Sequence, residues 1–272
     1  MSTSDNKFNS LCENLESCKL DVEKKISDEE LFKQPPQFYG DCPICFIRLP
    51  TLGTGWKYQT CCGKVICSGC KHAPLYDNKG NKVDNKKCPF CRIPQPATDK
   101  ENLKRMKQRV EADDPIAIHN TGCDYRDGIN GYPQDYTKAL ELCHRAAKLG
   151  YAKAYVNIGY IYDLGTGVQI DKKKAAHYYE LAAIGGDEVS RYNLALDEQT
   201  AGNIQRALKH FMIAVRGGDA PSLKEIQKLY SDGHVTKEDY AKALKSYQEY
   251  LAEIKSVQRD KAAAAHERYR YY

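Results

Sequence analysis

The sequence predicts a mainly α-helical protein, in which a small cysteine-rich module is followed by an α-solenoid of helix-turn-helix repeats. Two observations support this prediction. Eight of the twelve cysteines fall between residues 42 and 91. Beyond residue 113 alanine, tyrosine and leucine take over and recur with a period in the mid-thirties. A chain of 272 residues, 42% of them hydrophobic, is long enough to form packed cores in both parts.

The composition also restricts where the protein is expected to act. The N-terminus, MSTSDNKFNS, has no apolar segment of the kind that a secretory signal requires. No apolar run reaches the roughly twenty residues of a membrane span. The sequence therefore predicts a cytoplasmic or nuclear protein without a membrane partner. Thiols stay reduced in those compartments, where clustered cysteines are more often metal ligands than disulfides.

Residues 1–38 are expected to form either an N-terminal helix or a disordered segment. Apolar residues recur at helical spacing in this part of the chain. A helix this short is only marginally stable without a partner, so both interpretations stay open. The residues of the apolar stripe are Leu11, Leu15, Cys18, Val22 and Ile26.

Residues 39–97 contain a cysteine framework that is typical of metal ligands. Three C-x-x-C pairs occur here, in CPIC, CSGC and CPFC. A C-x-x-C turn places two sulfur atoms on the same side of a tight loop, as two corners of a zinc tetrahedron require. An adjacent pair of cysteines completes two sets of four, so the sequence predicts two structural zinc ions. The expected ligands are Cys42, Cys45, Cys61, Cys62, Cys67, Cys70, Cys88 and Cys91.

The order of these cysteines resembles the RING finger, specifically its all-cysteine variant, and CCGKVIC is similar to the centre of that variant. Third and fourth ligands are separated in the familiar RING finger, whereas Cys61 and Cys62 are adjacent. His72 therefore stays open as a substitute for Cys61, although we expect His72 to be a surface side chain. The resemblance implies a cross-brace, with one zinc ion on Cys42, Cys45, Cys67 and Cys70 and the other on Cys61, Cys62, Cys88 and Cys91.

RING fingers recruit a ubiquitin-conjugating enzyme that is already loaded with ubiquitin and orient its thioester, without a nucleophile of their own. The resemblance thus implies a RING-type ubiquitin-protein ligase with no catalytic residue in this chain. It also implies that Ile44, Pro89 and Arg92 contact the conjugating enzyme. Because each zinc ion would have four sulfur ligands, no position is left for a catalytic water.

We expect the metal ions to supply most of the folding free energy of this module, because so few residues cannot bury enough apolar surface. The sequence therefore predicts that chelation unfolds residues 41–95 and leaves the rest of the chain helical.

Residues 98–114 are predicted to form a linker helix that docks on the first repeat. Thr98 and Glu101 have the spacing of a capping box. Asp114 followed by Pro115 then starts the first helix of the repeats, because proline is favoured in the first turn.

Residues 115–254 contain about four copies of a repeat with two helical patterns each, which predicts an α-solenoid. The copy from 154 to 186 resembles the Sel-1-like repeat, a relative of the tetratricopeptide repeat, and Asp171 can cap its second helix. We expect a client protein to bind the repeats and residues 255–272 to form a helical tail. The alanines that keep step along the repeats are Ala139, Ala175, Ala207 and Ala243.

The net charge of +5 does not point to nucleic acid. Residues 41–98 carry nine basic and three acidic residues. Eight thiolates holding two zinc ions would reduce that excess to about +2. No basic cluster alternates with aromatic side chains that could stack on bases, so the sequence argues against a nucleic-acid partner. A non-enzymatic zinc-binding scaffold, or adaptor, that mediates protein–protein interaction remains the alternative to a ligase.

Overall fold

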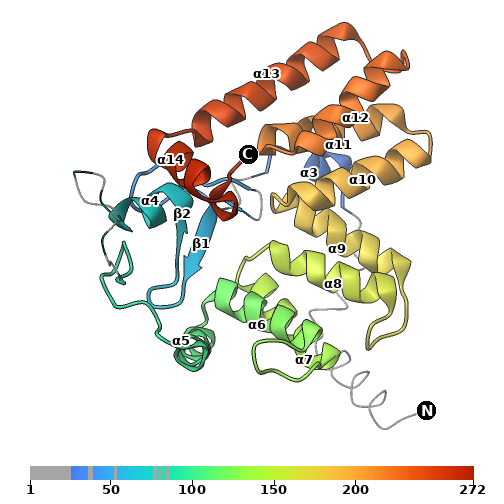
Figure 1. Cartoon of the computed structure of the whole chain (residues 1–272). Coiled ribbons are helices and arrows are strands. Elements are labelled where there is room, and N and C mark those ends of the chain that lie inside the picture. The colour runs from blue at the N-terminus through green and yellow to red at the C-terminus, as the bar shows by residue number, and fades with distance from the viewer. Residues whose placement is uncertain are drawn as a thin grey trace.

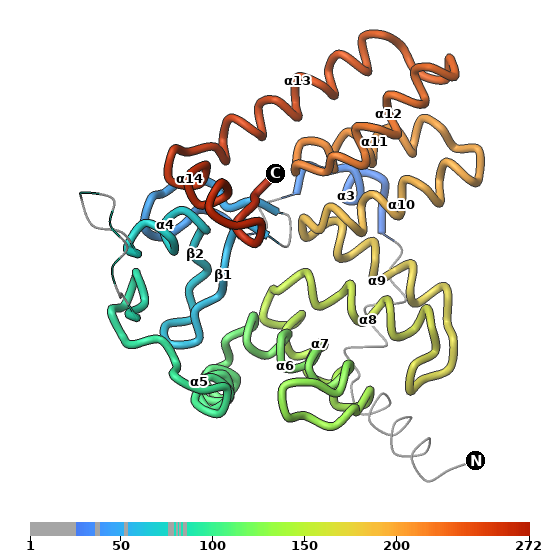
Figure 2. The backbone as a smooth tube through the Cα atoms, viewed as in Figure 1, coloured from blue at the N-terminus to red at the C-terminus, as the bar shows by residue number. Residues whose placement is uncertain are grey.

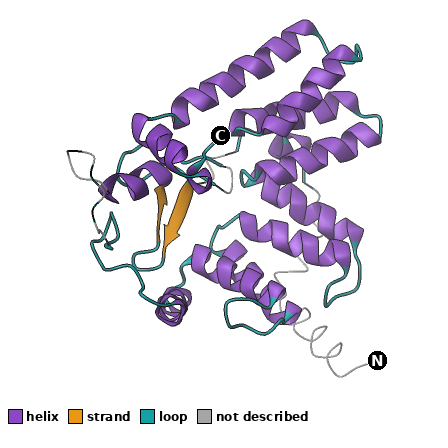
Figure 3. Ribbon diagram, in the orientation of Figure 1, coloured by secondary structure: helices purple, strands orange, loops and turns teal. Residues whose placement is uncertain are grey.

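The computed structural model describes residues 26–35, 39–51, 54–75, 79, 81, 83 and 86–272. It is mainly helical, with a two-stranded sheet in the cysteine-rich part and a helical solenoid beyond it (Figures 1 and 3). Four residues of the predicted apolar stripe, at positions 11, 15, 18 and 22, lie outside the described residues, and the fifth, Ile26, packs against the cluster around Leu31. Within the described part of the chain, no helix combines the length and the apolar character that crossing a bilayer requires.

The cysteine-rich module, residues 39–97, is built on an antiparallel hairpin whose second strand leads directly into a short helix. Its small core consists largely of cysteine sulfur, together with Leu49 and Ile66. Trp56 packs on the ring of Tyr39 at the edge of this core, with the ring centroids 4.4 Å apart. The elements are β1 (Trp56–Gln59), β2 (Lys64–Cys67), α4 (Ser68–His72) and η1 (Ala73–Leu75).

From residue 115 the chain forms antiparallel helix pairs that stack on one another. The four alanines that keep step along the repeats are all buried, as expected for positions where two helices approach closely. The linker helix is α5 (Asp99–Glu111), and the repeat helices are α6 (Pro115–Asp127), α7 (Tyr136–Lys148), α8 (Lys153–Leu164), α9 (Lys172–Ile184), α10 (Glu188–Thr200), α11 (Ile204–Gly217), α12 (Ala220–Ser231) and α13 (Lys237–Ile254).

The predicted helix starts are present, with one difference in detail. The Thr98 hydroxyl accepts the N–H of Glu101 at the start of α5 (3.2 Å). The Glu101 carboxylate, however, accepts the N–H of Ala97 (2.9 Å), one residue before the position that a capping box requires. Asp114 caps α6, with Pro115 in its first turn, and Asp171 caps α9.

The module lies along the edge of the solenoid that is formed by the turns between successive repeats (Figure 1). One hydrogen bond reaches the start of the first repeat, one the turn before α8 and one the last residue of α11. The contacts therefore extend along most of the solenoid. They join Tyr58 to Asp114 (2.7 Å), Tyr39 to Tyr151 (3.5 Å) and Thr51 to the carbonyl of Gly217 (2.5 Å).

The C-terminal segment, residues 255–272, folds back onto the module and does not project as a free tail (Figure 2). It contains α14 (Val257–Ala265), which packs on α4, and η2 (Glu267–Tyr269). The fully buried Arg259 donates hydrogen bonds to the carbonyls of Ile47 (3.1 Å) and Arg48 (2.7 Å). Tyr271, also fully buried, packs against Gly55.

A short N-terminal helix, α3 (Asp28–Leu31), docks against α9 and α10. Leu31 is buried there beside Ala183 and Leu194. The buried Arg191 donates hydrogen bonds to the carbonyls of Leu31 and Ala183, which fixes the segment to the solenoid.

Candidate metal centre

The eight cysteines of the module come together in two groups of four. In each group all the sulfur atoms lie within 4.8 Å of one another. The groups alternate along the chain, because the first group takes the first and third pairs of cysteines and the second group takes the second and fourth. They are Cys42, Cys45, Cys67 and Cys70 in the first group, and Cys61, Cys62, Cys88 and Cys91 in the second.

The distances between sulfur atoms fit a tetrahedral metal ion. A Zn–S bond of about 2.3 Å gives a tetrahedron whose edges are about 3.8 Å long. The Cys45 and Cys67 sulfurs are 3.8 Å apart, and those of Cys62 and Cys88 are 4.0 Å apart. Each group could therefore hold one metal ion after small side-chain adjustments.

Two C-x-x-C loops supply half of the candidate ligands and have the same backbone geometry. We call residues 41–48 knuckle 1 and residues 87–94 knuckle 2. In both, the first cysteine accepts a backbone N–H four residues later and donates to a carbonyl five residues later. These bonds are 2.9 and 3.0 Å in knuckle 1 and 3.0 and 2.8 Å in knuckle 2. The residue after the second cysteine is left-handed in both, with φ of 56° at Phe46 and 65° at Arg92.

The hairpin and the helix after it supply the other ligands. Cys61 and Cys62 lie in the turn between β1 and β2, where the N–H groups of Cys62 (3.2 Å) and Gly63 (2.8 Å) both bond to the carbonyl of Gln59. Gly63 has φ of +70°, a conformation that glycine adopts without strain. This tight turn directs two adjacent thiols into one group. At the end of β2, Cys67 caps α4 by accepting the N–H of Cys70 (3.4 Å).

Crowding of the thiols shifts their pKa values in both directions, as expected where neighbouring sulfur atoms cannot all carry a negative charge at once. Hydrogen bonds from the side chains of Cys67 and Cys70 hold the pKa of Cys42 well below its usual range. The same contact with Cys42 raises the pKa of Cys67 to about 11. Burial, followed by the neighbouring thiols, raises the pKa of Cys62 to about 11. Four such sulfurs become thiolates together at neutral pH only with a divalent metal among them.

The expectation that His72 is a surface side chain was wrong. His72 is buried and meets the ring of Tyr269 edge-on, with the centroids 5.5 Å apart. The C-terminal segment, which the sequence did not place, covers this side of α4. His72 belongs to neither sulfur group, and Cys61 belongs to the second.

Helices outside the module support the second group, through contacts that no pattern in the sequence indicates. Arg109 of α5 donates to the carbonyl of Cys61 (3.0 Å) and, with a longer bond, to that of Thr60 (3.4 Å). Tyr58, one residue from the end of β1, bonds to Asp114. The turn that carries the adjacent cysteines is thus fixed to the start of the first repeat.

The residues expected to contact a conjugating enzyme all lie on the knuckles. Ile44 is 36% exposed, Arg92 is exposed and Pro89 is partly buried. Sequence reasoning missed three further apolar side chains on the knuckles, Phe46, Phe90 and Ile93, which are 77%, 42% and 43% exposed. The equivalence of CPICFIRLP and CPFCRIPQP, 46 residues apart, is the signal that could have found them.

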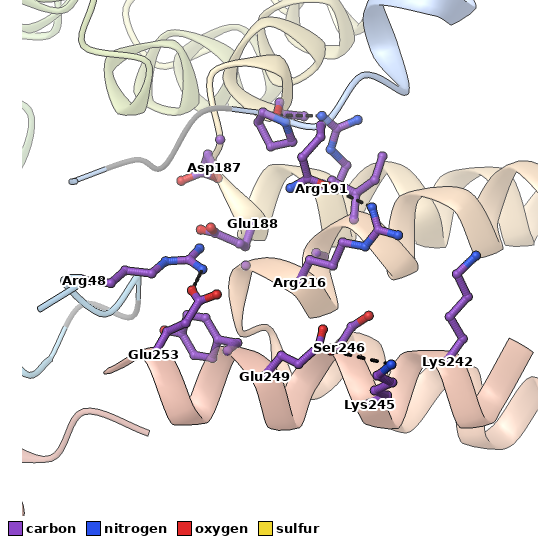
Figure 4. Close-up of a pocket in the computed structure, with 18 residues that line it drawn as sticks. Arg48, Asp187, Glu188, Arg191, Arg216, Lys242, Lys245, Ser246, Glu249 and Glu253 are labelled. Atoms are coloured by element: carbon purple, nitrogen blue, oxygen red, sulfur yellow. Dashed lines mark hydrogen bonds and ion pairs between the residues drawn. The ribbon is translucent and has the colours of Figure 1, made fainter. Parts of the chain in front are cut away.

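A cavity of about 530 Å³ lies where knuckle 1 meets the repeats (Figure 4). Carboxylates of Asp187, Glu188 and Glu253 gather around Arg48 on one side of it. Arg48 forms an ion pair with Glu253 (2.5 Å). Burial raises the pKa of Glu188 to about 8, and the nearby Asp187 raises it further while Arg48 opposes the shift. Across the cavity, Figure 4 shows basic side chains of α11 and α13, which are Arg216, Lys242 and Lys245.

The chain contains Sel1 repeats: the family model described as "Sel1 repeat" matches residues 115–151, 152–187 and 228–248. The stretch between the last two matches forms α10, α11 and most of α12, and only three residues join α10 to α11. The two helices of a repeat are therefore present in this stretch, although the loop that joins them is shorter than in the other repeats.

Several curated proteins are similar to parts of the chain. One is the ERAD-associated E3 ubiquitin-protein ligase component HRD3B of Arabidopsis thaliana, 30% identical over 40% of this chain. Another is the E3 ubiquitin-protein ligase DA2 of the same plant, 32% identical over 25%. Protein sel-1 homolog 2 of Homo sapiens is 30% identical over 35%. The matches span 17%, 16% and 12% of these relatives, respectively.

Two solved structures are similar to the chain over 63% of its length. A Sel1 repeat protein from Oxalobacter formigenes has a TM-score of 0.47 at 26% identity, and 72% of that chain is covered. The protective antigen c5321 of uropathogenic Escherichia coli, described as displaying an SLR fold, has a TM-score of 0.47 at 22% identity, with 38% covered.

Proposed function

We propose that this chain is a zinc-binding, RING-type ubiquitin-protein ligase. The cysteine-rich module recruits a ubiquitin-conjugating enzyme, and the Sel1 repeats bind a client protein. The observation that carries the proposal is the alternation of two compact four-cysteine groups along the chain. This arrangement is the cross-brace that the resemblance to RING fingers implies.

Zinc in these groups would be structural. Four thiolates complete the tetrahedral coordination of zinc, so no position remains at which water could be activated. The eight proposed ligands are Cys42, Cys45, Cys67 and Cys70 at the first site and Cys61, Cys62, Cys88 and Cys91 at the second. Their task is to hold the knuckles in a fixed shape, on which the proposed enzyme contacts lie.

The proposed contacts to the conjugating enzyme are Ile44, Pro89 and Arg92. Ile44 has apolar surface available for a partner. The backbone at Arg92 is left-handed, and its long side chain is exposed. A planar guanidinium can bond to carbonyl groups of two proteins at once, which a lysine ammonium cannot reproduce. Enzyme and ubiquitin would thus be held in one orientation for transfer.

The relatives support a role in ubiquitin transfer. One is named an E3 ubiquitin-protein ligase and another an E3 ligase component. The repeats of this chain would bind the client. A client in the charged cavity between knuckle 1 and the solenoid would lie beside the module.

The test is discharge of ubiquitin from a panel of loaded conjugating enzymes by the purified, zinc-loaded protein. We expect discharge and self-ubiquitination by the natural sequence, loss of both in Ile44→Ala, and strong weakening in Arg92→Ala. Ile170→Ala is the matched control, because Ile170 is 59% exposed but lies in a repeat turn. If the natural sequence discharges no enzyme of a broad panel, the ligase proposal is wrong.

The alternative is a non-enzymatic zinc-binding scaffold or adaptor. The observation that favours it is that the module bonds to the rest of its own chain, to the repeats at Asp114 and to the C-terminal segment at Arg259. A titration of a conjugating enzyme against the protein separates the two functions. A scaffold would bind its protein partners through the module or the repeats, yet show no affinity for the conjugating enzyme.

A further inference from the structure

Each knuckle is held from outside by an arginine that belongs to a different flanking helix. Arg259 of α14 donates through Nη1 to the carbonyl of Arg48 in knuckle 1 (2.7 Å). Arg105 of α5 donates through Nη1 to the carbonyl of Pro94 in knuckle 2 (2.7 Å). The two carbonyls are equivalent, since each lies six residues after the first cysteine of its knuckle.

The equivalence extends to the surrounding backbone. Asp41 forms an isolated β-bridge with Arg48 in knuckle 1, and Lys87 forms one with Pro94 in knuckle 2. The arginine therefore bonds to the residue that closes the knuckle in both cases. Any movement of this residue would change the positions of the two sulfur atoms inside the knuckle.

Arg259, which holds knuckle 1, is more deeply buried than Arg105, which holds knuckle 2. Arg259 is fully buried and also donates to the carbonyls of Ile47 (3.1 Å) and Ile254 (2.6 Å). The carbonyl of Ile47 is the same one that accepts the N–H of Cys42 (3.0 Å). Arg259 thus bonds to a group that is itself bonded to a proposed metal ligand.

The second sulfur group is held by two arginines of α5, of which Arg105 bonds to knuckle 2. The Arg105 side chain is 17% exposed and forms an ion pair with Glu101, one turn earlier on the same helix. Arg109 adds the bond to the carbonyl of Cys61, on the other half of the same sulfur group. Loss of Arg105 alone should therefore have a smaller effect than loss of Arg259.

We propose that Arg259 and Arg105 are matched positioning residues, each of which holds one metal site in its binding geometry. Groups that orient metal ligands from outside typically change metal affinity by about 10- to 100-fold when they are removed. Because α5 precedes the first repeat and α14 follows the last, each metal site is also tied to one end of the solenoid.

This inference rests on the proposed metal sites, so the experiment first measures the zinc content of the natural full-length protein. The protein is then challenged with a chelator and a thiol-alkylating reagent, and mass spectrometry reports the alkylation rate of each cysteine. In Arg259→Ala we expect the cysteines of the first group to react about tenfold faster or more, with little change in the second. In Arg105→Ala we expect the second group to react faster, by a smaller factor, with little change in the first.

Two further variants make the result decisive. Arg270→Ala removes an exposed arginine from the same C-terminal segment and should leave both groups unchanged. Arg259→Lys keeps the charge but loses the planar guanidinium that bonds to several carbonyls. If Arg259→Ala fails to fold, Arg259→Lys should still show faster alkylation of the first group with little change in the second. If the natural protein binds two zinc ions but Arg259→Ala and Arg105→Ala speed up alkylation of both groups equally, or of neither group, this inference is wrong while the metal sites stand. Absence of bound zinc in the natural protein would overturn the metal sites as well.

Discussion

Tyr271 packs so closely on Gly55 that a methyl group on Gly55 would lie 2.4 Å from the Cβ atom of Tyr271. Gly55 also has φ of +83°, which side-chain-bearing residues rarely adopt. The penultimate residue of the chain is therefore fixed to the strand entry of the cysteine-rich module. The two ends of the solenoid both reach this module, and the stability of each part depends on the other.

Removing the Tyr271 side chain should destabilise the protein substantially. Tyr271 is fully buried and its hydroxyl donates to Asp260. Tyr271→Ala leaves a cavity and should lower the free energy of unfolding by about 3 kcal/mol or more. Tyr272→Ala is the matched control, since Tyr272 is 64% exposed, and should change stability by less than about 0.5 kcal/mol. Urea denaturation followed by circular dichroism measures both. Equal effects of the two variants would contradict the packing described.

Metal removal should affect more of the chain than the sequence alone predicted. α14 packs chiefly on α4, which contains the proposed ligand Cys70 and begins directly after the proposed ligand Cys67. We therefore expect chelation to raise amide exchange in residues 41–95 and also in 257–265. Exchange in α8 and α9, which have their own core around Ile158 and Tyr178, should change little. Unchanged protection of α14 would argue against this coupling.

Asp114 should contribute more to stability than an ordinary helix cap. Its Oδ1 accepts the N–H groups of Ile116 and Ala117, and its Oδ2 accepts the Tyr58 hydroxyl. Asp114→Ala should cost about 1 kcal/mol for the cap and about 1 kcal/mol more for the second bond. Asp171→Ala, which removes the cap of α9, is the comparison and should cost only about 1 kcal/mol. Thermal or urea unfolding gives the difference, and Tyr58→Phe should abolish it.

Stability should fall between pH 6.5 and pH 4 because of buried histidines in the repeats. Burial lowers the pKa of His119, His144 and His210 to about 4. A depressed histidine pKa means that only the unfolded chain takes up the proton in this range. The stabilisation is therefore complete above pH 6.5 and is lost as the pH falls, by about 1.4 kcal/mol per histidine and pH unit.

The measurement is the free energy of unfolding in urea at several pH values. His144→Gln should reduce the slope against pH, because one of the three groups no longer titrates. The comparison with the natural sequence also removes the contribution of thiolate protonation at the metal sites, which both proteins share. A slope that stays the same in His144→Gln would count against a depressed pKa for that residue.

Much of the local structure could be predicted from the sequence. The C-x-x-C spacing indicated tight turns with two sulfurs on one side, and the structure forms such turns at Cys42 and Cys88. Thr98, Asp114 and Asp171 indicated where helices begin. These features depend on residues only a few positions apart, so the spacing along the chain already contains the geometry.

The grouping of the cysteines could be predicted in part from the sequence. The fact that eight thiols form two sets of four follows from their number and spacing, and their alternation was expected from a family resemblance. Ligation by zinc and the contacts of Ile44, Pro89 and Arg92 remain predictions, which the experiments above test. The surface position expected for His72 was wrong, because it depended on a segment almost 200 residues away.

The sequence by itself determined the periodic helices, their caps and the thiol-bearing turns. Only the tertiary structure decided that the C-terminal segment covers α4, that α3 docks on the repeats and that the module lies along the inter-repeat turns. The physical reason is visible in Arg259 and Arg191, whose partners are backbone carbonyls. Every residue carries a carbonyl group, so no residue type marks such a partner in the sequence.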